Sequence, residues 1–481
     1  MSRGSRMSTD HRNPREGDRA RQAEGRRFRR GLTATIGVLA GASVLLGAAS
    51  LTQGPKLADA AIDVERATTL AGSRLVLELN QPVDRVDGDV VVTPDESFEL
   101  EIDGDRLVVS FDEPLPYDEA VTVTIDGVVG TAQPAAATIE YRFTTADEPV
   151  HTLVRRSPEG EPDVVRRSSV GDPTPEDVLE APRLRSFAHA GDVVVGVAIE
   201  DDGSNSLRVA GIGDTTQTIA FPEPGTVNSI GGSTTQPLVA YTFNPAAGDA
   251  EPAPQSVLYT LDVSGAAAEP VPVLGPDGTP VTVNDWVFVP GTTSVVVQDV
   301  DGAVFLADAL GLSPAQPLGT HAELRGMLPG TTDLILADPD RGTILDLETG
   351  EARENVLPSA ELPDEAYPGH VMQLDDTGTH LLEVLIVSGD GVGSVATEAL
   401  LARVGEAETV VLHATGADSR RLATCVSPNG RLVAVETAPI GADSDGYPNA
   451  PSLVGRLTTI VDIETGEVVL TQNGGSSDWC H

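Results

Sequence analysis

The sequence predicts an all-β chain behind a single apolar N-terminal segment. Short runs rich in Val, Leu, Ile and Thr alternate apolar and polar positions, which is the pattern of half-buried strands. Turn residues separate these runs, and the 481 residues include 49 Gly and 35 Pro but only 4% aromatic residues. A strand–turn–strand unit also recurs along most of the chain. These features favour many short strands over helices.

The N-terminal stretch differs from the rest of the chain. Residues 1–30 are polar and arginine-rich without an apolar period, so we expect a disordered basic cytoplasmic tail. The next segment, 31–52, is apolar, and no charged residue occurs from Gly31 to Leu51. About 20 apolar residues span a bilayer as a helix. We therefore expect one transmembrane helix with the N-terminus in the cytoplasm, because basic residues precede it.

Two roles stay open for this segment. It is either an uncleaved signal anchor or a signal peptide cleaved after Ala60, in the sequence Ala58-Asp-Ala60. We favour the anchor because the run is longer than a typical signal-peptide core. The anchor gives a single-pass protein of the cell membrane with an extracytoplasmic body, and cleavage gives a secreted protein.

Charge divides the chain at the same place. The formal net charge is −42, but residues 1–60 hold 11 basic and 5 acidic residues while the other 421 hold 20 and 68. A body this acidic should repel nucleic acid and anionic membrane surfaces and attract basic ligands or divalent cations. Solubility at an exposed surface explains the same charge without a partner.

Residues 61–146 form the first predicted domain, a β-sandwich. Leu75–Leu79 and Leu107–Phe111 alternate as half-buried strands. The remaining predicted strands are Val90–Thr93, Phe98–Ile102, Val121–Ile125 and Ile139–Phe143. Asp-Gly turns between these runs have the spacing of a sandwich.

This domain resembles the bacterial Ig-like domain of S-layer and other surface proteins. The resemblance lies in Leu75–Asp84, in Leu107–Pro116 followed by Val121–Ile125, and in Tyr141–Thr145. It implies a spacer or adhesion module and no active site.

Residues 147–481 repeat a strand–turn–strand unit. The sharpest copies are Gly342–Glu351 and Thr459–Glu467, each with a Glu-Thr-Gly turn, and looser copies start near His151, Leu207, Ser256, Ala303 and Ala399. Further strand pairs lie between the hairpins, and four strands in about 48 residues make a propeller blade. The turn Ser427–Gly430 is similar to the Ser-Pro-Asp-Gly turn of TolB-type and WD-repeat-like propellers, which implies a fold but no function.

We expect seven blades, with six as the alternative. Six are complete from residue 184 onward, and the hairpin at 151–167 is half of another. The C-terminal residues 477–481 would supply its inner strand and close the ring. Residues 168–183, rich in Pro and acid, are expected to be linker-like.

The two cysteines, Cys425 and Cys480, lie in the exported part, where an oxidising environment favours a disulfide. Cys425 falls in the inner strand of the last full blade and Cys480 in the strand assigned to the closing blade. Inner strands of neighbouring blades lie side by side, so the two cysteines can meet. Two buried free thiols, or metal ligands, are the alternatives.

Few residues suggest chemistry. Asp299 with Asp301, and Asp443 with Asp445, form Asp-x-Asp-Gly sequences that are weak Ca²⁺ candidates, although Asp and Gly are also what a hairpin turn selects. The histidines do not cluster, and no Gly-x-Ser-x-Gly elbow occurs. Trp286 and Trp479 are candidates for the propeller mouth, with core packing as the alternative.

The sequence therefore predicts a non-catalytic cell-envelope protein without a resident cofactor. A membrane-tethered Ig-like stalk would present an acidic propeller to an envelope protein, a peptide or a cell-wall polymer, and not to nucleic acid. Two alternatives stay open: an extracytoplasmic propeller hydrolase or lyase with an unidentified site, and a purely structural or adhesive surface module.

Overall fold

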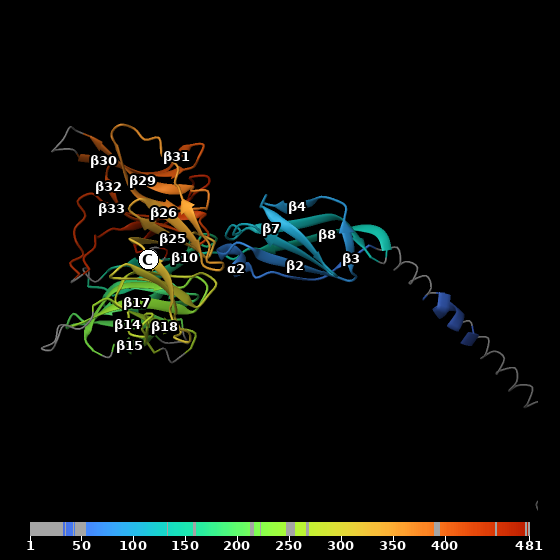
Figure 1. The fold of residues 1–481 in the computed structure, drawn as a ribbon, viewed down its shortest axis with the longest axis horizontal. Helices are drawn as coiled ribbons and strands as arrows, with labels where there is room; N and C mark the ends of the chain where they lie inside the picture. Colours follow the sequence, from blue (N-terminus) through green and yellow to red (C-terminus); the bar gives the residue numbers. More distant parts are fainter. Residues whose placement is uncertain are drawn as a thin grey trace, which may run out of the picture.

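A computed structural model gives the fold of the chain (Figure 1). It describes residues 32–33, 35–41, 43, 54–131, 133–156, 160–211, 216–221, 223–246, 255–265, 269–388, 395–447, 450–476 and 479. A small β-domain lies between the N-terminal segment and a larger β-domain, as predicted (Figure 1).

The N-terminal segment is described only in part. Residues 32–33, 35–41 and 43 are helical. Among the residues that the structure describes, no helix is both long and apolar enough to cross a membrane. The predicted tail at 1–30 and most of the predicted span at 31–52 lie outside the described residues, so both stay predictions.

The smaller domain is a sandwich of two antiparallel sheets. One sheet has the order β1 (Leu57–Ala61), β2 (Ser73–Leu79), β6 (Arg106–Phe111) and β5 (Phe98–Asp103). In the other, β7 (Ala120–Gly130) pairs with β3 (Val83–Val86), β4 (Val90–Thr93) and β8 (Gln133–Thr144). The domain begins earlier than the predicted residue 61, because β1 pairs with β2 from residue 57.

The sandwich core confirms the alternation in the sequence. Leu75, Leu77 and Leu107 from one sheet and Val123 and Ile125 from the other are fully buried in one apolar cluster. Their neighbours along the strands are more exposed, as a period of two requires.

One short helix, α2 (Val64–Thr69), was missed in the sequence. Asp63 caps it by accepting a hydrogen bond from the Arg66 N–H (3.0 Å). The helix lies at the end of the sandwich that faces the larger domain (Figure 1).

The larger domain is a β-propeller, and its described residues form seven sheets. Six sheets have four strands whose spatial order follows the sequence. We number the blades in chain order. Blade 1 is β12 (Leu184–Ala190), β13 (Val193–Ile199), β14 (Asn205–Ala210) and β15 (Gln217–Ala220); blade 2 is β16 (Gly225–Gly232), β17 (Leu238–Pro245), β18 (Val257–Asp262) and β19 (Val271–Pro272); blade 3 is β20 (Val283–Phe288), β21 (Ser294–Asp299), β22 (Ala303–Asp308) and β23 (Gln316–Thr320). Blade 4 is β24 (Glu323–Met327), β25 (Asp333–Asp338), β26 (Arg341–Asp346) and β27 (Ala352–Asn355); blade 5 is β28 (Ala366–Gln373), β29 (His380–Ser388), β30 (Val395–Val404) and β31 (Thr409–Thr415); blade 6 is β32 (Ser419–Val426), β33 (Leu432–Pro439), β34 (Leu457–Asp462) and β35 (Val468–Asn473).

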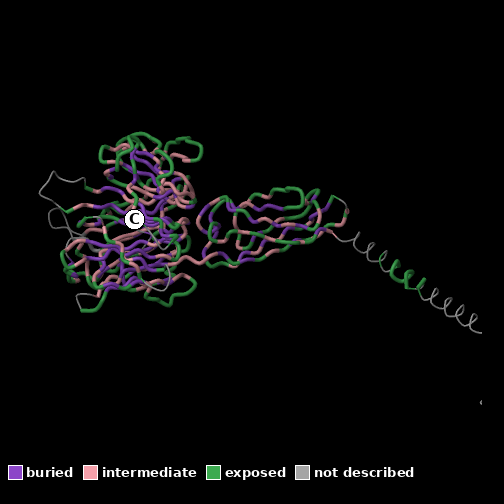
Figure 2. Tube along the Cα trace, turned by 90° about the horizontal axis from the view of Figure 1, so that it is seen from below, coloured by how far each residue is buried: buried purple, intermediate pink, exposed green. Residues whose placement is uncertain are grey.

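The second strand of each full blade is the most deeply buried. β13, β21 and β33 each have runs of consecutive buried residues, because neighbouring blades cover both of their faces. Figure 2 shows this buried interior within the blades and the exposed turns around it. The valine-rich runs of the sequence therefore mark the middle of the blades.

Blade 7 closes the ring with residues from both ends of the domain. It contains β9 (Pro149–Val154), β10 (Asp163–Ser169) and β11 (Glu176–Ala181). The inner edge of β9 is paired by Gly475, whose N–H and carbonyl both bond to Leu153 (3.1 and 2.8 Å). The C-terminal segment therefore begins to close the blade two residues before the stretch we predicted, and most of 477–481 lies outside the described residues.

The expectation of a linker at residues 168–183 was wrong. β10 continues to Ser169, and β11 pairs with it across Asp163–Arg167. β11 is the outer edge strand, where only one neighbour is required, so a run rich in acid can still pair there.

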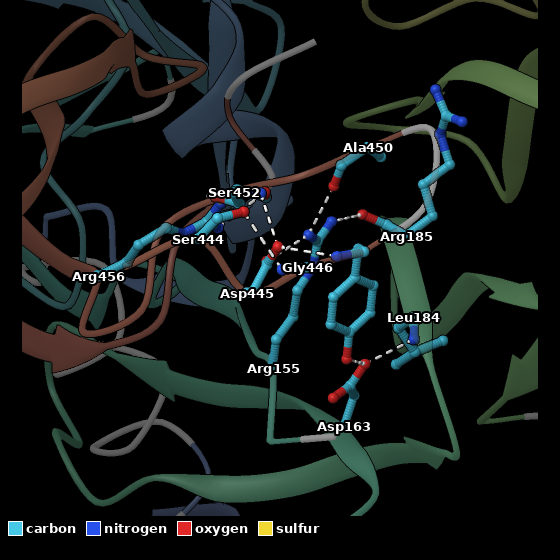
Figure 3. A network of polar contacts seen from close by, with 12 residues as sticks. Arg155, Asp163, Leu184, Arg185, Ser444, Asp445, Gly446, Ala450, Ser452 and Arg456 are labelled. Atoms are coloured by element: carbon cyan, nitrogen blue, oxygen red, sulfur yellow. Dashed lines mark hydrogen bonds and ion pairs between the residues drawn. The ribbon is translucent and has the colours of Figure 1, made fainter. Parts of the chain in front are cut away.

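Buried polar side chains lock the ring where its ends meet (Figure 3). Arg155, directly after β9, forms an ion pair with Asp445 (2.7 Å), and the two side chains are 9% and 3% exposed. The same guanidinium donates to the carbonyls of Ala450 and Arg185 and lies over the Tyr447 ring, 4.4 Å from its centroid. One side chain of blade 7 thereby joins blade 6 to blade 1.

A second set of contacts extends this closure network. The Asp163 carboxylate accepts a hydrogen bond from the Leu184 N–H of blade 1 (2.7 Å). Arg456 pairs with Glu436 (3.1 Å), both nearly buried, and Glu436 also accepts the Ser476 N–H (2.6 Å). The C-terminal segment is thus held by side chains as well as by its strand pairing.

Breaking the Arg155–Asp445 pair should destabilise the protein strongly. Arg155→Met leaves a buried carboxylate without its cation, which costs about 3–5 kcal/mol. Urea unfolding followed by circular dichroism measures this loss. The matched control is Arg74→Met, since the Arg74–Glu101 pair (3.6 Å) is 62% and 66% exposed and should contribute less than about 1 kcal/mol. Equal losses in the two variants would contradict this account.

Low pH should remove the contribution of the Arg155–Asp445 pair to the free energy of unfolding. Burial raises the pKa of Asp445, but hydrogen bonds from the Ser452 N–H and Arg155 outweigh burial and hold this pKa below its ordinary value. A depressed carboxyl pKa stabilises the folded state above about pH 4 and loses its effect as the pH falls through the folded-state pKa. The difference between wild type and Arg155→Met should therefore shrink below pH 4.

Candidate functional site

The propeller has two unlike faces. Inner strands all run in one direction, so the turns from first to second strand lie on one face, while the turns from second to third strand and the links between blades lie on the other. The first face carries the sandwich, and we call it the capped face. We call the second face the open face; in Figure 1 it points away from the sandwich.

The sandwich is bonded directly to the capped face. The Ala71 N–H donates to the Gly330 carbonyl between β24 and β25 (2.8 Å). A Cβ at Gly330 would meet the Pro114 ring at 2.4 Å, and φ there is +73°, so this approach requires glycine. Arg431 donates two hydrogen bonds to the Pro114 carbonyl (3.0 and 2.8 Å) and pairs with Glu96 (2.7 Å).

The turn at residues 427–430 forms the rest of this contact. Asn429 donates from its side chain to the Leu115 carbonyl (3.4 Å) and from its N–H to the Tyr117 hydroxyl (3.3 Å). Tyr117 itself packs in an apolar cluster with Leu432 of blade 6 and Val150 of blade 7. The turn that resembles other propellers is therefore used here to seat the sandwich.

Burial at this contact changes two pKa values. Removal from water raises the pKa of Tyr117 well above its ordinary value. It also raises the pKa of Glu96, although the Arg431 guanidinium opposes the shift. Both groups are thus withdrawn from solvent between the two domains.

A chamber of about 740 Å³ lies under α2, inside the ring. Glu65, Thr68 and Thr69 of α2 line it together with residues from the inner strands of blades 1 to 6. The sandwich therefore covers the channel at the capped face. Sequence reasoning missed this cover, although Asp63 ahead of Val64-Glu-Arg is a recognisable helix start.

Both tryptophans of the chain line this chamber. Trp286 stands edge-on to Phe288 in β20, with ring centroids 5.8 Å apart. Trp479 donates its indole N–H to Glu148 (3.2 Å), just before β9. Trp479 is also buried in the apolar cluster with Leu432 and Val150, as the alternative of core packing predicted, whereas Trp286 is half-buried.

The open face carries many exposed carboxylates. Those of its described turns and blade links are Glu161, Asp201, Asp202, Glu223, Asp277, Asp301, Asp340, Glu361, Asp364, Glu365, Asp418 and Asp443. Arginines of the same segments are engaged: Arg155 and Arg456 are nearly buried ion-pair partners, and Arg183 lies 3.5 Å from Asp201. This face should therefore have a strongly negative potential.

Two of the four calcium candidates, Asp299 and Asp445, have other roles. Asp299 accepts the N–H groups of Asp301 and Ala303 (both 2.9 Å), as a turn-capping carboxylate does. Asp445 is the partner of Arg155, while Asp301 and Asp443 are exposed. Among the described residues, no group of three or more His, Cys, Asp or Glu side chains can hold a metal ion.

The structure describes only one of the two cysteines. Cys425 is half-buried at the end of β32, lines the chamber, and packs against the apolar cluster that includes Trp479. It is not a free thiol. Cys480 follows Trp479 in the sequence but lies outside the described residues, so the pairing of the two cysteines stays a prediction.

No protein-family model matches the chain, and no curated protein matches it in sequence. The solved structures that are similar in fold include the following three. Dihydro-heme d1 dehydrogenase NirN in complex with DHE is 12% identical with a TM-score of 0.37, over 68% of this chain and 74% of that chain. A TolB protein from Agrobacterium tumefaciens is 13% identical with a TM-score of 0.30, over 69% and 91%. The Cps50 (Swd1) β-propeller domain from Myceliophteria thermophila is 10% identical with a TM-score of 0.35, over 62% and 89%. At these values no argument about function rests on them.

Mass spectrometry without reduction should show one peptide pair linked through Cys425 and Cys480. The link closes a loop of about 55 residues, which stabilises the folded chain by roughly 4 kcal/mol on the entropic model. Reduction should lower the thermal midpoint accordingly. Rapid alkylation of both thiols in native protein would rule the pairing out.

Proposed function

We propose that the chain is a non-catalytic cell-envelope protein that presents the open face of its propeller to a cationic partner. The observation that carries the proposal is the difference between the faces. The sandwich is bonded to one of them, and the other carries exposed carboxylates on its turns and blade links. A partner with basic groups on a peptide or wall polymer fits that face.

Two observations support the membrane anchor in this proposal, one from the sequence and one from strand β1. An uncharged stretch follows the arginines of residues 26–30. Cleavage after Ala60 would remove most of β1 from its sheet, whose pairs run from Leu57 to Ala61. An uncleaved anchor keeps that strand in place.

The Ig-like assignment of the stalk is also part of the proposal. Two antiparallel sheets over one apolar core are what an Ig-like domain requires. A domain of this kind separates the propeller from the bilayer and leaves the open face directed outward.

An enzyme is the second candidate, and one observation favours it. Asp285 lies within the inner strand β20, and Glu323 begins the inner strand β24 of the neighbouring blade. Burial raises the pKa of Asp285, and the charge of Glu323 adds to that shift. A carboxyl group whose pKa is raised in this way can serve as a general acid.

Binding of a nine-residue polyarginine peptide to the full chain tests the proposed face. The open-face variant carries Asp364→Asn, Glu365→Gln and Asp418→Asn. The matched variant removes three exposed charges from the sandwich, with Glu99→Gln, Asp103→Asn and Asp105→Asn. Each exposed ion pair contributes about 0.2–1 kcal/mol, so titration calorimetry should give about tenfold weaker binding for the first variant only.

Salt gives a second readout of the same experiment. Affinity should fall steeply as ionic strength rises, because the charges are exposed. Equal weakening in both triple variants would mean that the peptide follows net charge and not the open face, and the proposal would fail.

A further inference from the structure

We infer that the capped chamber is a second binding site, which takes a small organic cation with an apolar body. This inference does not depend on the open face. It rests on the volume of the chamber, the placement of its aromatic and sulfur-containing side chains, and the charge of its lining.

The chamber has the size of a ligand site. Its volume of about 740 Å³ lies within the range of about 300–1,000 Å³ typical of small-molecule pockets. Its walls are inner strands, which are held by pairing on the second strand of each blade, and its cover is α2. Folding therefore builds the site before any ligand arrives.

One side of the chamber is apolar and polarisable. Trp286 and Phe288 come from blade 3, Met327 from blade 4 and Met372 from blade 5. Methionine adapts its shape to irregular ligands, and the face of a tryptophan attracts cations. An alkyl or aryl body carrying a positive charge matches this wall.

Two acidic residues lie on the other side of the ring, where Asp147 and Glu148 line the chamber directly before β9 of blade 7. A third, Glu65, lines it from α2 above. In a ring of seven blades, the position opposite blade 7 lies between blades 3 and 4. A ligand that crosses the chamber can therefore place its charge near the carboxylates and its body against Trp286.

The two arginines that line the chamber do not reverse its preference for a cation. Arg167 already faces Asp192 (3.5 Å), and Arg325 faces Glu323 (3.0 Å). Carboxylates in the lining thus outnumber arginines, and each arginine has an acidic neighbour. An anionic ligand would meet like charge and lose its own hydration. A bare metal ion is not the expected ligand, because the described residues offer no cluster to hold one.

Intrinsic tryptophan fluorescence reports on this chamber, since the only two tryptophans of the chain both line it. The full chain is titrated with hexyltrimethylammonium, and separately with hexanoate and 1-hexanol. We expect a saturable change with the cation and none with the anion at matched concentrations. The neutral alcohol should bind more weakly than the cation.

Two variants locate the charge. Glu65→Gln on exposed α2 and Asp147→Asn before β9 should each weaken cation binding about fivefold, the effect of one partly exposed ion pair. Glu101→Gln, on the outer edge of the sandwich, is the matched control and should change nothing. The open-face triple variant should also leave the cation titration unchanged, which separates this site from the proposed partner surface.

The inference is overturned by any of three results. These are a response that stays linear up to the solubility limit of the cation, equal binding of hexanoate, and unchanged affinity in both Glu65→Gln and Asp147→Asn. Failure of polyarginine binding at the open face would leave these titrations unaffected.

Discussion

Ring closure is the constraint on which the rest of the molecule depends. Blade 7 is built from residues 149–181, yet its inner edge is paired by Gly475 near the other end of the domain. Strand pairing there is short, and side-chain hydrogen bonds and buried ion pairs add to the attachment. Arg155 and Asp445 are nearly buried, and Arg155 donates hydrogen bonds to carbonyl groups of blades 6 and 1. Neither charge can be solvated by water unless the ring opens. The closed ring fixes the positions of the inner strands, and these positions define both the channel and the two faces.

The second consequence concerns the sandwich. Its contacts with the capped face are specific ones: a backbone hydrogen bond at Gly330, a glycine-only approach to Pro114, and an arginine that meets both a carbonyl and a carboxylate. The sandwich is therefore a fixed part of the propeller surface. It stands over the channel at the capped face and leaves the opposite face, with its exposed carboxylates, open to a partner.

Much of the architecture could be predicted because strand period and turn chemistry are local. Alternation in Leu75–Leu79 gave a sandwich strand, and repeated hairpins gave the blades. Several short elements were missed, including β3 (Val83–Val86) in the sandwich. β1 lies mostly before the domain boundary predicted at residue 61, α2 has only six residues, and β11 is an acidic edge strand.

The candidate site could not be predicted from the sequence for a different reason. Asn429 and Tyr117 are 312 residues apart in the chain, and the chamber exists only where seven blades and α2 meet.

Hydrogen exchange of the Ala71 amide tests the seating of the sandwich most directly. This amide donates to Gly330 across the two domains, so its protection depends on that contact. Mass spectrometry of overlapping peptides across residues 67–75 isolates it. We expect slow exchange in the wild-type chain and faster exchange in Arg431→Ala, with the amides between β2 and β6 unchanged. Exchange of the wild-type Ala71 amide at the rate of an unprotected one would mean that the sandwich moves free of the propeller, and the covered chamber would not exist.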